Sequence, residues 1–403
     1  MPEGIFLTLT DLALRRAGVQ NLEAFQQQKG LSPTGQEDTL TTQQLLPYLL
    51  GYERYMLQPG DSFYRIARRF GTSIDAIRTA NPTVSPLRLT VGQYITVPYG
   101  FPVVPTDIPF TSELLQVCIR GLLARYPFLT SRTLTTTDYQ RPVSLLQMGK
   151  GNRSVLYNAS HHANEWITTP LLMKFLEDYA EAVSRGTSLF GMDARTLFER
   201  TQLYLAPMVN PDGVDLVTGA ASAQEVRIAQ DIAAFFPSIP FPDGWKANLN
   251  GTDLNLNYPA RWEQAQENKF ALGFDRPAPR DFVGLAPLDQ KESRAMYDLT
   301  RLVNPRLTLS YHSQGEVIYW KFLDIEPPEA ESIGRRFARV SGYLLEDTPF
   351  ASGFAGYKDW FILAYNRPGY TVEVGMGQSP LPLSQFDDIY EKNLGILALG
   401  LTL

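Results

Sequence analysis

Several features that mark other classes of protein are absent from this chain of 403 residues. Cys118 is its only cysteine, which excludes an intramolecular disulfide and a cluster of thiolate metal ligands. No apolar run approaches the roughly 18 residues of a membrane-spanning helix, so we expect no membrane partner. Basic runs stop at Arg68-Arg69 and Arg335-Arg336 and the net charge is −6, so we expect no nucleic-acid partner. The first residues lack a basic segment followed by an apolar stretch, so an export signal is not evident.

What the chain does contain is enough apolar surface for a folded core. Hydrophobic residues make up 44% of the sequence and aromatic residues 12%, which excludes a disordered or fibrous protein. At about 150 residues per domain, the length indicates two or three domains.

The first region, residues 1–52, shows the apolar spacing of three short helices. They are expected over Leu9–Ala17, Leu22–Gln28 and Asp38–Leu50. Thr39 or Thr41 is available to cap the last of them. Three short helices bury little surface, so we expect this module to lean on its neighbours.

The second region, residues 53–99, alternates between strand and helix patterns. The expected elements are a strand over Tyr55–Gln58, helices over Phe63–Phe70 and Ser73–Asn81, and a strand over Leu89–Val97. The turn Pro59-Gly-Asp-Ser62 precedes the first helix and caps it, and Ser73 caps the second.

This order of elements and motifs resembles a LysM module. The resemblance rests on Pro59-Gly-Asp-Ser62, Ile66-Ala67, Phe70-Gly71, Ile77, Ala80-Asn-Pro82, Leu89, Val91-Gly-Gln93 and Ile95-Thr-Val-Pro98. LysM modules bind glycans that contain N-acetylglucosamine, such as peptidoglycan. The resemblance therefore implies glycan contacts from Gly60, Asp61, Ser62, Phe63, Asn81 and Pro82.

The first region is in turn similar to small helical peptidoglycan-binding domains. Its matching residues are Ala24-Phe-Gln26, Gly30-Leu31, Thr34-Gly35 and Thr41–Leu45. Spacers without a ligand are the alternative for both modules.

The third region, residues 107–403, follows a proline-rich linker and carries the pattern of an α/β domain. The linker prolines are Pro98, Pro102, Pro105 and Pro109. Short apolar runs alternate with helical stretches at Val155–Asn158, Gln202–Met208, Leu307–Tyr311 and Gly369–Val374. This alternation predicts a mixed, mainly parallel sheet flanked by helices, with its chemistry at the strand ends.

The three histidines of the chain, His161, His162 and His312, stand at two of these strand ends. His162 and Glu165 are three residues apart, so both can reach one cation from a strand-end loop or first helical turn. His312 follows the apolar strand Leu307–Tyr311. Two imidazole nitrogens and one carboxylate, with a position left for water, form a catalytic zinc site.

Together with an acid at a further strand end, Glu373, these residues resemble the M14 family of zinc carboxypeptidases. Further landmarks in the family's order are Asn210-Pro-Asp-Gly213, Gly251-Thr-Asp-Leu-Asn255 and His312-Ser-Gln-Gly315. The resemblance implies one Zn²⁺ on His162, Glu165 and His312, and leaves His161 as a structural histidine.

The same resemblance assigns roles around the metal. Glu373 becomes the general acid and base that moves protons between water and the leaving amine. Asp253 matches the acid that orients the first histidine ligand. Lys246, in Trp245-Lys246, stands where the family has an arginine that stabilises the oxyanion; a solvated surface lysine is the alternative.

Two departures from the family pattern concern the terminal carboxylate of a peptide substrate. Asn255-Leu256 replaces the family's Asn-Arg pair, and Asn164 replaces a second substrate-binding arginine. Such losses resemble the subgroup of γ-D-glutamyl-diaminopimelate endopeptidases, which cut peptidoglycan stem peptides. The implied substrate contacts are Asn255, Lys358, Glu316 and Tyr357.

We therefore expect a zinc endopeptidase with wall-binding modules, acting on peptidoglycan glycan and stem peptides. A carboxypeptidase of broader specificity and a non-catalytic wall-binding protein are the alternatives. The absence of an evident export signal favours a cytoplasmic or spore-associated protein, acting during sporulation, wall recycling or lysis.

Overall fold

The N-terminal module consists of three helices, as the sequence predicts. The computed structural model describes residues 8–349 and 353–403. The helices are α1 (Leu9–Ala17), α2 (Leu22–Gln28) and α3 (Thr39–Leu50). Asp38, and neither expected threonine, caps α3: its carboxylate accepts a hydrogen bond from the backbone N–H of Thr41 at 2.7 Å. Leu12 of α1 joins the main core of the C-terminal domain, so this module packs against its neighbour, as expected.

The second module folds in the predicted order of strand, helix, helix and strand. Its elements are β1 (Tyr52–Met56), α4 (Phe63–Phe70), α5 (Ile74–Ala80) and β2 (Tyr94–Pro98). Both helices match the prediction, including their caps Ser62 and Ser73.

Both strands of this module are shifted from their predicted positions. The antiparallel pairing runs from Tyr52 opposite Pro98 to Met56 opposite Tyr94. The predicted strand from Leu89 is therefore wrong over its first half. Gly92 has φ +85°, outside the extended region, and this turn ends any strand that comes before it.

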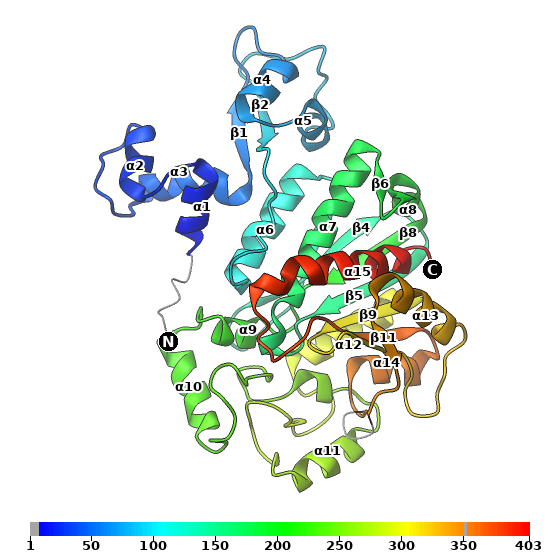
Figure 1. Cartoon of the computed structure of the whole chain (residues 1–403). Coiled ribbons are helices and arrows are strands. Elements are labelled where there is room, and N and C mark those ends of the chain that lie inside the picture. Colours follow the sequence, from blue (N-terminus) through cyan, green and yellow to red (C-terminus); the bar gives the residue numbers. More distant parts are fainter. Residues whose placement is uncertain (1–7, 350–352) are drawn as a thin grey trace.

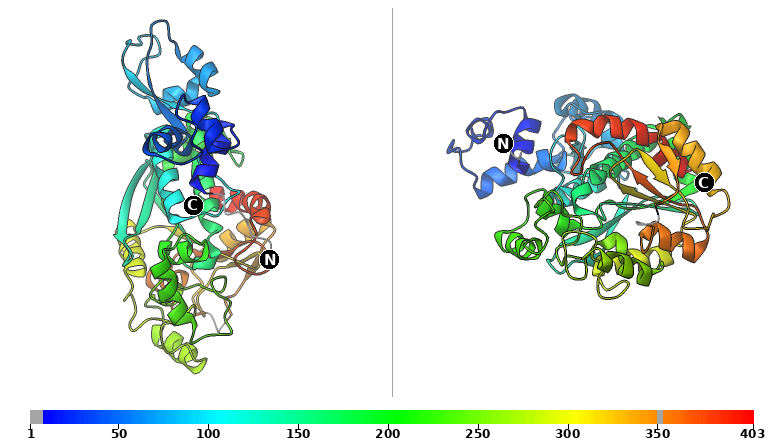
Figure 2. Two further views of the ribbon diagram at one scale, coloured as in Figure 1. Left: turned by 90° about the vertical axis from the view of Figure 1, so that its left-hand side faces the viewer. Right: turned by 60° about the horizontal axis from the view of Figure 1, so that its bottom comes forward.

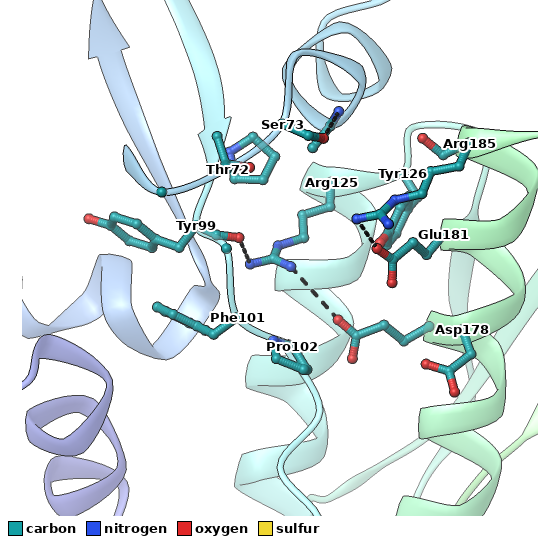
Figure 3. A pocket seen from close by; sticks show the side chains of 16 residues that line it. Thr72, Ser73, Tyr99, Phe101, Pro102, Arg125, Tyr126, Asp178, Glu181 and Arg185 are labelled. Carbon is teal, nitrogen blue, oxygen red and sulfur yellow. Dashed lines mark hydrogen bonds and ion pairs between the residues drawn. The ribbon is translucent and has the colours of Figure 1, made fainter. Parts of the chain in front are cut away.

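The predicted linker packs against the C-terminal domain. Val103, Val104, Ile108 and Phe110 are buried in the main core. The backbone N–H groups of Val103 and Val104 donate to the buried carboxylate of Glu177 at 2.6 and 2.9 Å. Figure 3 shows Arg125 beneath the second module, where its guanidinium donates to the carbonyl of Tyr99.

The C-terminal domain is built on a sheet of eight strands, and the predicted mixed, mainly parallel character of this sheet is confirmed. The strand order is β11-β10-β12-β9-β5-β8-β4-β3. The strands are β3 (Thr130–Thr136), β4 (Pro142–Gly149), β5 (Arg153–Ala159), β8 (Thr201–Ala206), β9 (Leu307–His312), β10 (Val317–Tyr319), β11 (Leu344–Glu346) and β12 (Gly369–Glu373). The central strands β8, β5, β9 and β12 are parallel, and each coincides with a predicted apolar run.

Helices cover both faces of this sheet, and shorter elements connect them. The helices are α6 (Ser112–Arg125), α7 (Thr168–Arg185), α8 (Ala194–Arg200), α9 (Pro211–Val217), α10 (Ala223–Ala233), α11 (Trp262–Ala271), α12 (Lys291–Val303), α13 (Ala330–Ser341), α14 (Tyr357–Tyr365) and α15 (Phe386–Gly400). The shorter elements are the hairpin of β6 (Ser188–Leu189) and β7 (Met192–Asp193) and the 3₁₀ turns η1 (Ala163–Glu165), η2 (Leu254–Leu256) and η4 (Leu383–Gln385).

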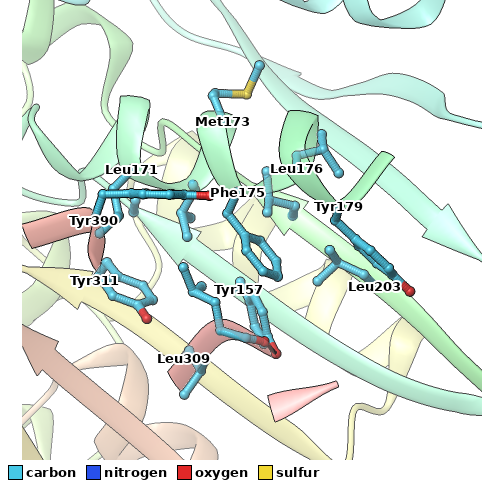
Figure 4. Close-up of a cluster of buried hydrophobic side chains, with 14 of the residues drawn as sticks. Tyr157, Leu171, Met173, Phe175, Leu176, Tyr179, Leu203, Leu309, Tyr311 and Tyr390 are labelled. Carbon is cyan, nitrogen blue, oxygen red and sulfur yellow. Dashed lines mark hydrogen bonds between the residues drawn. The ribbon is translucent and has the colours of Figure 1, made fainter. Parts of the chain in front are cut away.

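Alternate residues of the central strands supply two separate cores. Tyr157 of β5 packs with residues of α7 and α15, and Figure 4 shows this core around Phe175, Leu309 and Tyr390. Leu156, the preceding residue of β5, points to the other face and packs with residues of α12 and α14. Two buried faces explain why these strands are apolar throughout.

Figure 1 and Figure 2 agree that the two N-terminal modules lie at one end of the C-terminal domain. Helix α11 lies at the opposite end in these views. Among the described residues, no helix is long and apolar enough to cross a membrane.

Candidate active site

Three side chains converge at the carboxyl ends of the adjacent strands β5 and β9. His162 follows β5, Glu165 lies in the turn η1, and His312 is the last residue of β9. The His162 Nδ1 lies 2.9 Å from Glu165 Oε1, and His312 Nδ1 lies 2.8 Å from Glu165 Oε2. The two Nδ1 atoms are 3.2 Å apart. Parallel strand order therefore brings together residues that are 147 positions apart in the sequence.

This donor set fits a zinc ion. The three residues offer ligand atoms that all lie within 4.8 Å of one another. Two imidazole nitrogens and one carboxylate are a ligand set of catalytic zinc, which keeps a further position for water or substrate. Two ring nitrogens facing each other across a buried carboxylate also suit a shared cation better than a hydrogen bond between them.

Asp253 orients His162 from the side opposite the ligand atom. Its Oδ1 lies 3.1 Å from His162 Nε2, and its Oδ2 accepts from the backbone N–H of Asp281 at 3.2 Å. A carboxylate on the second ring nitrogen fixes the ring and leaves Nδ1 to face the metal position. The geometry agrees with the role that the sequence predicts for Asp253.

The electrostatics of the ligands differ because their neighbours differ. Burial lowers the pKa of His162, but the carboxylates of Glu165 and Asp253 outweigh it and raise the pKa to about 9. Burial dominates at His312 and lowers its pKa. Burial opposes ionisation of Glu165, yet His162, Lys246 and His312 hold its pKa well below the usual range. Glu165 is thus ionised and ready to bind a cation.

Glu373 lies beside this ligand set at the end of β12, opposite His312 in the strand register. Burial and the charge of Glu165 raise the pKa of Glu373 to about 8, against the opposing charges of Lys246 and His162. A carboxyl with a raised pKa in a cleft is suited to accept and return a proton near neutral pH.

Lys246 belongs to the site and is not a solvated surface lysine. Its Nζ lies 2.8 Å from Glu165 Oε1, and its side chain is only 19% exposed. The side chain borders the same cavity as His162 and Glu373, where its ammonium can face an oxygen of a substrate.

The cavity beside the ligands has a volume of about 200 Å³ and a highly charged lining. Of the predicted substrate contacts, Asn255 and Lys358 line it, and so does Leu256. Lys358, however, is 4% exposed and forms an ion pair with Asp359 at 2.7 Å. Its ammonium also donates to the carbonyl of Lys321 and the hydroxyl of Thr348. Its charge is therefore already neutralised.

The structure does not bring Tyr357 or Glu316 into this cavity. Tyr357 is fully buried at the start of α14, and its hydroxyl lies 2.8 Å from that of Thr300. Glu316 forms an ion pair with Lys392 of α15 at 2.6 Å. Both side chains are held by contacts that the sequence does not reveal, since each partner is more than 50 residues away.

His161 is a structural histidine, as expected. It is fully buried, and its Nε2 lies 2.9 Å from the hydroxyl of Tyr258. It does not belong to the group of possible metal ligands among the described residues.

Sequence reasoning missed several residues that line the cavity. They are Lys269, Arg280, Asp281, Tyr319 and Thr371. Arg280 lies in an irregular loop after Pro279 and belongs to no periodic pattern, so its charge is the only sequence signal that could have drawn attention to it.

In the second module, most of the predicted glycan-binding side chains stabilise the module itself. The Asp61 carboxylate accepts from Tyr55 and Gln58, and Asn81 bridges to the backbone of Thr96. Ser62 caps α4 and Phe63 is in the core. Only Gly60 and Pro82 of this set are well exposed.

Comparison with known families shows to which protein family the chain belongs. Residues 115–395, more than half of the chain, match the zinc carboxypeptidase family, Peptidase M14. The protein belongs to this family of metallopeptidases, and it also carries a LysM domain at residues 55–98.

The comparisons also found individual proteins and solved structures that are similar to this chain. The chain is 47% identical over 285 residues to gamma-D-glutamyl-L-diamino acid endopeptidase 1 of Lysinibacillus sphaericus, covering 71% of this chain and 70% of the relative. It is 38% identical to the uncharacterized protein YqgT of Bacillus subtilis (strain 168), covering 69% and 73%. Among solved structures, thrombin activatable fibrinolysis inhibitor has a TM-score of 0.59 at 17% identity, covering 81% of this chain and 79% of that one. The last similarity concerns the fold alone.

Proposed function

We propose that the protein is a zinc-dependent endopeptidase that hydrolyses the γ-D-glutamyl–diaminopimelate bond of peptidoglycan stem peptides. The observation that carries the proposal is the complete set of His162, Glu165, His312 and Glu373 in a chain 47% identical to a gamma-D-glutamyl-L-diamino acid endopeptidase. Leu256 supports it, because an apolar side chain in the cavity cannot bind the terminal carboxylate that a carboxypeptidase must hold.

His162, Glu165 and His312 would hold one Zn²⁺, which lowers the pKa of water and polarises a carbonyl group. Glu373 takes the proton from the attacking water and returns it to the amine of the leaving diamino acid. Lys246 donates a hydrogen bond to the carbonyl oxygen as negative charge develops on it. Asp253 keeps the ring of His162 in place throughout.

A second part of the proposal concerns the N-terminal modules and their binding to the cell wall. We propose three units, residues 1–52, 53–99 and 107–403, with the LysM domain binding glycan near Gly60 and Pro82 and the helical module assisting it. The buried linker and the ion pair of Arg15 with Asp107 support a fixed arrangement of the three units. The cytoplasmic or spore-associated location stays a prediction that fractionation of sporulating cells would test.

The experiment that tests the proposal is mass spectrometry of L-Ala-γ-D-Glu-meso-diaminopimelate after incubation with zinc-loaded protein. We expect L-Ala-D-Glu and free diaminopimelate from the native protein and intact peptide from Glu373→Gln. Glu331→Gln, at an exposed position of α13, is the matched control and should keep activity.

Intact tripeptide together with release of C-terminal residues from ordinary peptides would support the carboxypeptidase alternative. Protein that binds neither zinc nor substrate would support the non-catalytic alternative.

A further inference from the structure

Arg280 borders two cavities, the first of which is also lined by the metal ligand His162. The first cavity contains His162, Asn255 and Glu373. The second has a volume of about 350 Å³ and includes Asn164, Ser313 and Ser379. Of the lining residues, Lys246 and Arg280 border both cavities. A substrate that occupies both cavities therefore lies against these two cations.

The backbone on each side of Arg280 is tied to the metal site. The carbonyl of Pro279 accepts from the backbone N–H groups of Lys246 and Ala247 at 2.7 and 2.9 Å. The N–H of Asp281 donates to Asp253, the carboxylate that orients His162. The root of the Arg280 side chain is thus fixed relative to the metal ligands, as a specificity-determining residue requires.

The guanidinium of Arg280 keeps free donors and shares its one ion-pair partner with a second cation. Its Nε donates to Asp281 at 2.7 Å, while its two terminal nitrogens donate to no residue within 8–349 or 353–403. Asp281 is shared with Lys269 at 2.5 Å, so one carboxylate faces two cations. The Arg280 side chain is 41% exposed, which leaves its terminal nitrogens accessible.

The lysines of the cavity are each paired through their single side-chain nitrogen, which cannot offer two parallel donors to a carboxylate. Lys246 pairs with Glu165, Lys269 with Asp281 and Lys358 with Asp359. Arg280 therefore remains as the group with two unused, parallel donors, the arrangement that matches a carboxylate.

The proposed substrate has a free carboxylate that these two donors can bind. When glutamate is linked through its γ-carbonyl, its α-carboxylate stays free on the acyl side of the scissile bond. In an α-linked peptide the same α-carbonyl is part of the scissile amide, and no charge occupies that place.

We propose that Arg280 binds the free α-carboxylate of the glutamate residue and thereby selects γ-linked substrates. This inference rests on the proposed function and adds a subsite to it.

The experiment compares two substrates that differ only in this carboxylate. One is L-Ala-γ-D-Glu-meso-diaminopimelate, and the other carries D-isoglutamine, whose α-carboxamide has the same shape without the charge. For the native protein we expect kcat/KM to be roughly 10- to 100-fold higher for the acid than for the amide. In Arg280→Gln the two substrates should differ by less than about 3-fold, because the charged partner is gone.

Several controls test whether the change in substrate preference is specific to Arg280. Asp281 remains paired with Lys269 in Arg280→Gln, so we expect native zinc content and an unchanged unfolding midpoint. Arg280→Lys keeps the charge but loses the paired donors, and should retain part of the preference. Arg276→Gln, at a 55% exposed side chain of the same loop, should keep the full preference.

Each remaining outcome counts against the proposal. A native protein that cleaves both substrates equally, or an Arg280→Gln variant that keeps the preference, overturns the subsite while the endopeptidase function stands. Equal losses on both substrates would show that Arg280 acts on another group. A native protein that cleaves neither γ-linked substrate contradicts the proposed function, and the subsite with it.

Discussion

The two halves of the active-site cavity differ in how their charges are arranged. In the metal half, His162, Glu165 and His312 face one another, and Glu373 lies beside them with a raised pKa. In the substrate half, Lys358 is neutralised by Asp359 at 2.7 Å, while Arg280 keeps two free donors. Lys358, which the sequence predicts as a substrate contact, is therefore already paired. Arg280, which the sequence analysis did not single out, is available to a substrate.

This difference shows that charge alone does not identify a substrate contact. Lys358 lines the cavity, but at 4% exposure its ammonium already has two hydrogen-bond acceptors and an ion-pair partner. A metal ligand has no such ambiguity, because the convergence of several ligand atoms on one point is itself the functional feature.

The largest effect is expected from removing a ligand in the metal half. His312→Ala should lower zinc affinity by more than roughly 100-fold, since even an outer-shell change costs about 10–100-fold, and activity should be lost with it. Zinc content by elemental analysis after dialysis is the measurement. His161→Gln is the matched control and should retain zinc; equal loss in both variants would contradict the ligand assignment.

In the substrate half, Lys358→Met tests whether this lysine is structural. It leaves the carboxylate of Asp359 buried without its counter-ion and with only the backbone N–H of Gly356 as a donor, so we expect a loss of about 3–5 kcal/mol in the free energy of unfolding. Denaturant unfolding measures this, and Lys358→Met/Asp359→Asn should recover part of the loss. Unchanged stability with a raised KM would instead identify Lys358 as a substrate contact, and the contrast between the halves would be lost.

Asp253→Asn tests the support of the metal half. The variant keeps the shape of the side chain but loses the charge that orients His162, so we expect zinc affinity or kcat/KM to fall by about 10–100-fold. Competition with a metal chelator measures the affinity. Zinc binding and turnover both at native levels would exclude the orienting role.

The pH dependence of zinc binding tests the electrostatics of the metal half of the cavity. Because His162 has a pKa of about 9 before metal binding, zinc must displace its proton at neutral pH. Affinity should rise by up to about tenfold per pH unit from pH 7 to about 9 and then level off. Calorimetry in buffers with different ionisation enthalpies would detect the released proton. Affinity that does not change with pH over this range would contradict the electrostatic account.

The smallest effect is expected for Tyr357→Phe. The variant loses the hydrogen bond to Thr300, and we expect the free energy of unfolding to fall by about 0.5–1.5 kcal/mol. KM for the tripeptide should not change, because the hydroxyl lies outside the cavity. A clear rise in KM with native stability would instead show that Tyr357 contacts the substrate.

The sequence by itself determined the elements that have a strong local pattern. The helices Phe63–Phe70 and Leu9–Ala17, the four central strands and the strand-end positions of His162, His312 and Glu373 all follow from apolar periodicity and spacing. The edge strand Thr130–Thr136 was missed, because it is mostly exposed and rich in threonine and has no apolar run.

Only the tertiary structure decided which charged side chains are available to a substrate. The sequence does not distinguish Lys358 from Arg280, since each precedes an aspartate, and it gives Glu316 no charged partner among its immediate neighbours. Packing gives Lys358 the carbonyl of Lys321 as an acceptor, pairs Glu316 with Lys392 and leaves the terminal nitrogens of Arg280 open to the cavity. Lys358 and Arg280 each have an aspartate beside them in the sequence, but whether the rest of the charge stays open to a substrate depends on further partners brought close by the fold. The spacing of residues along the chain does not encode that proximity.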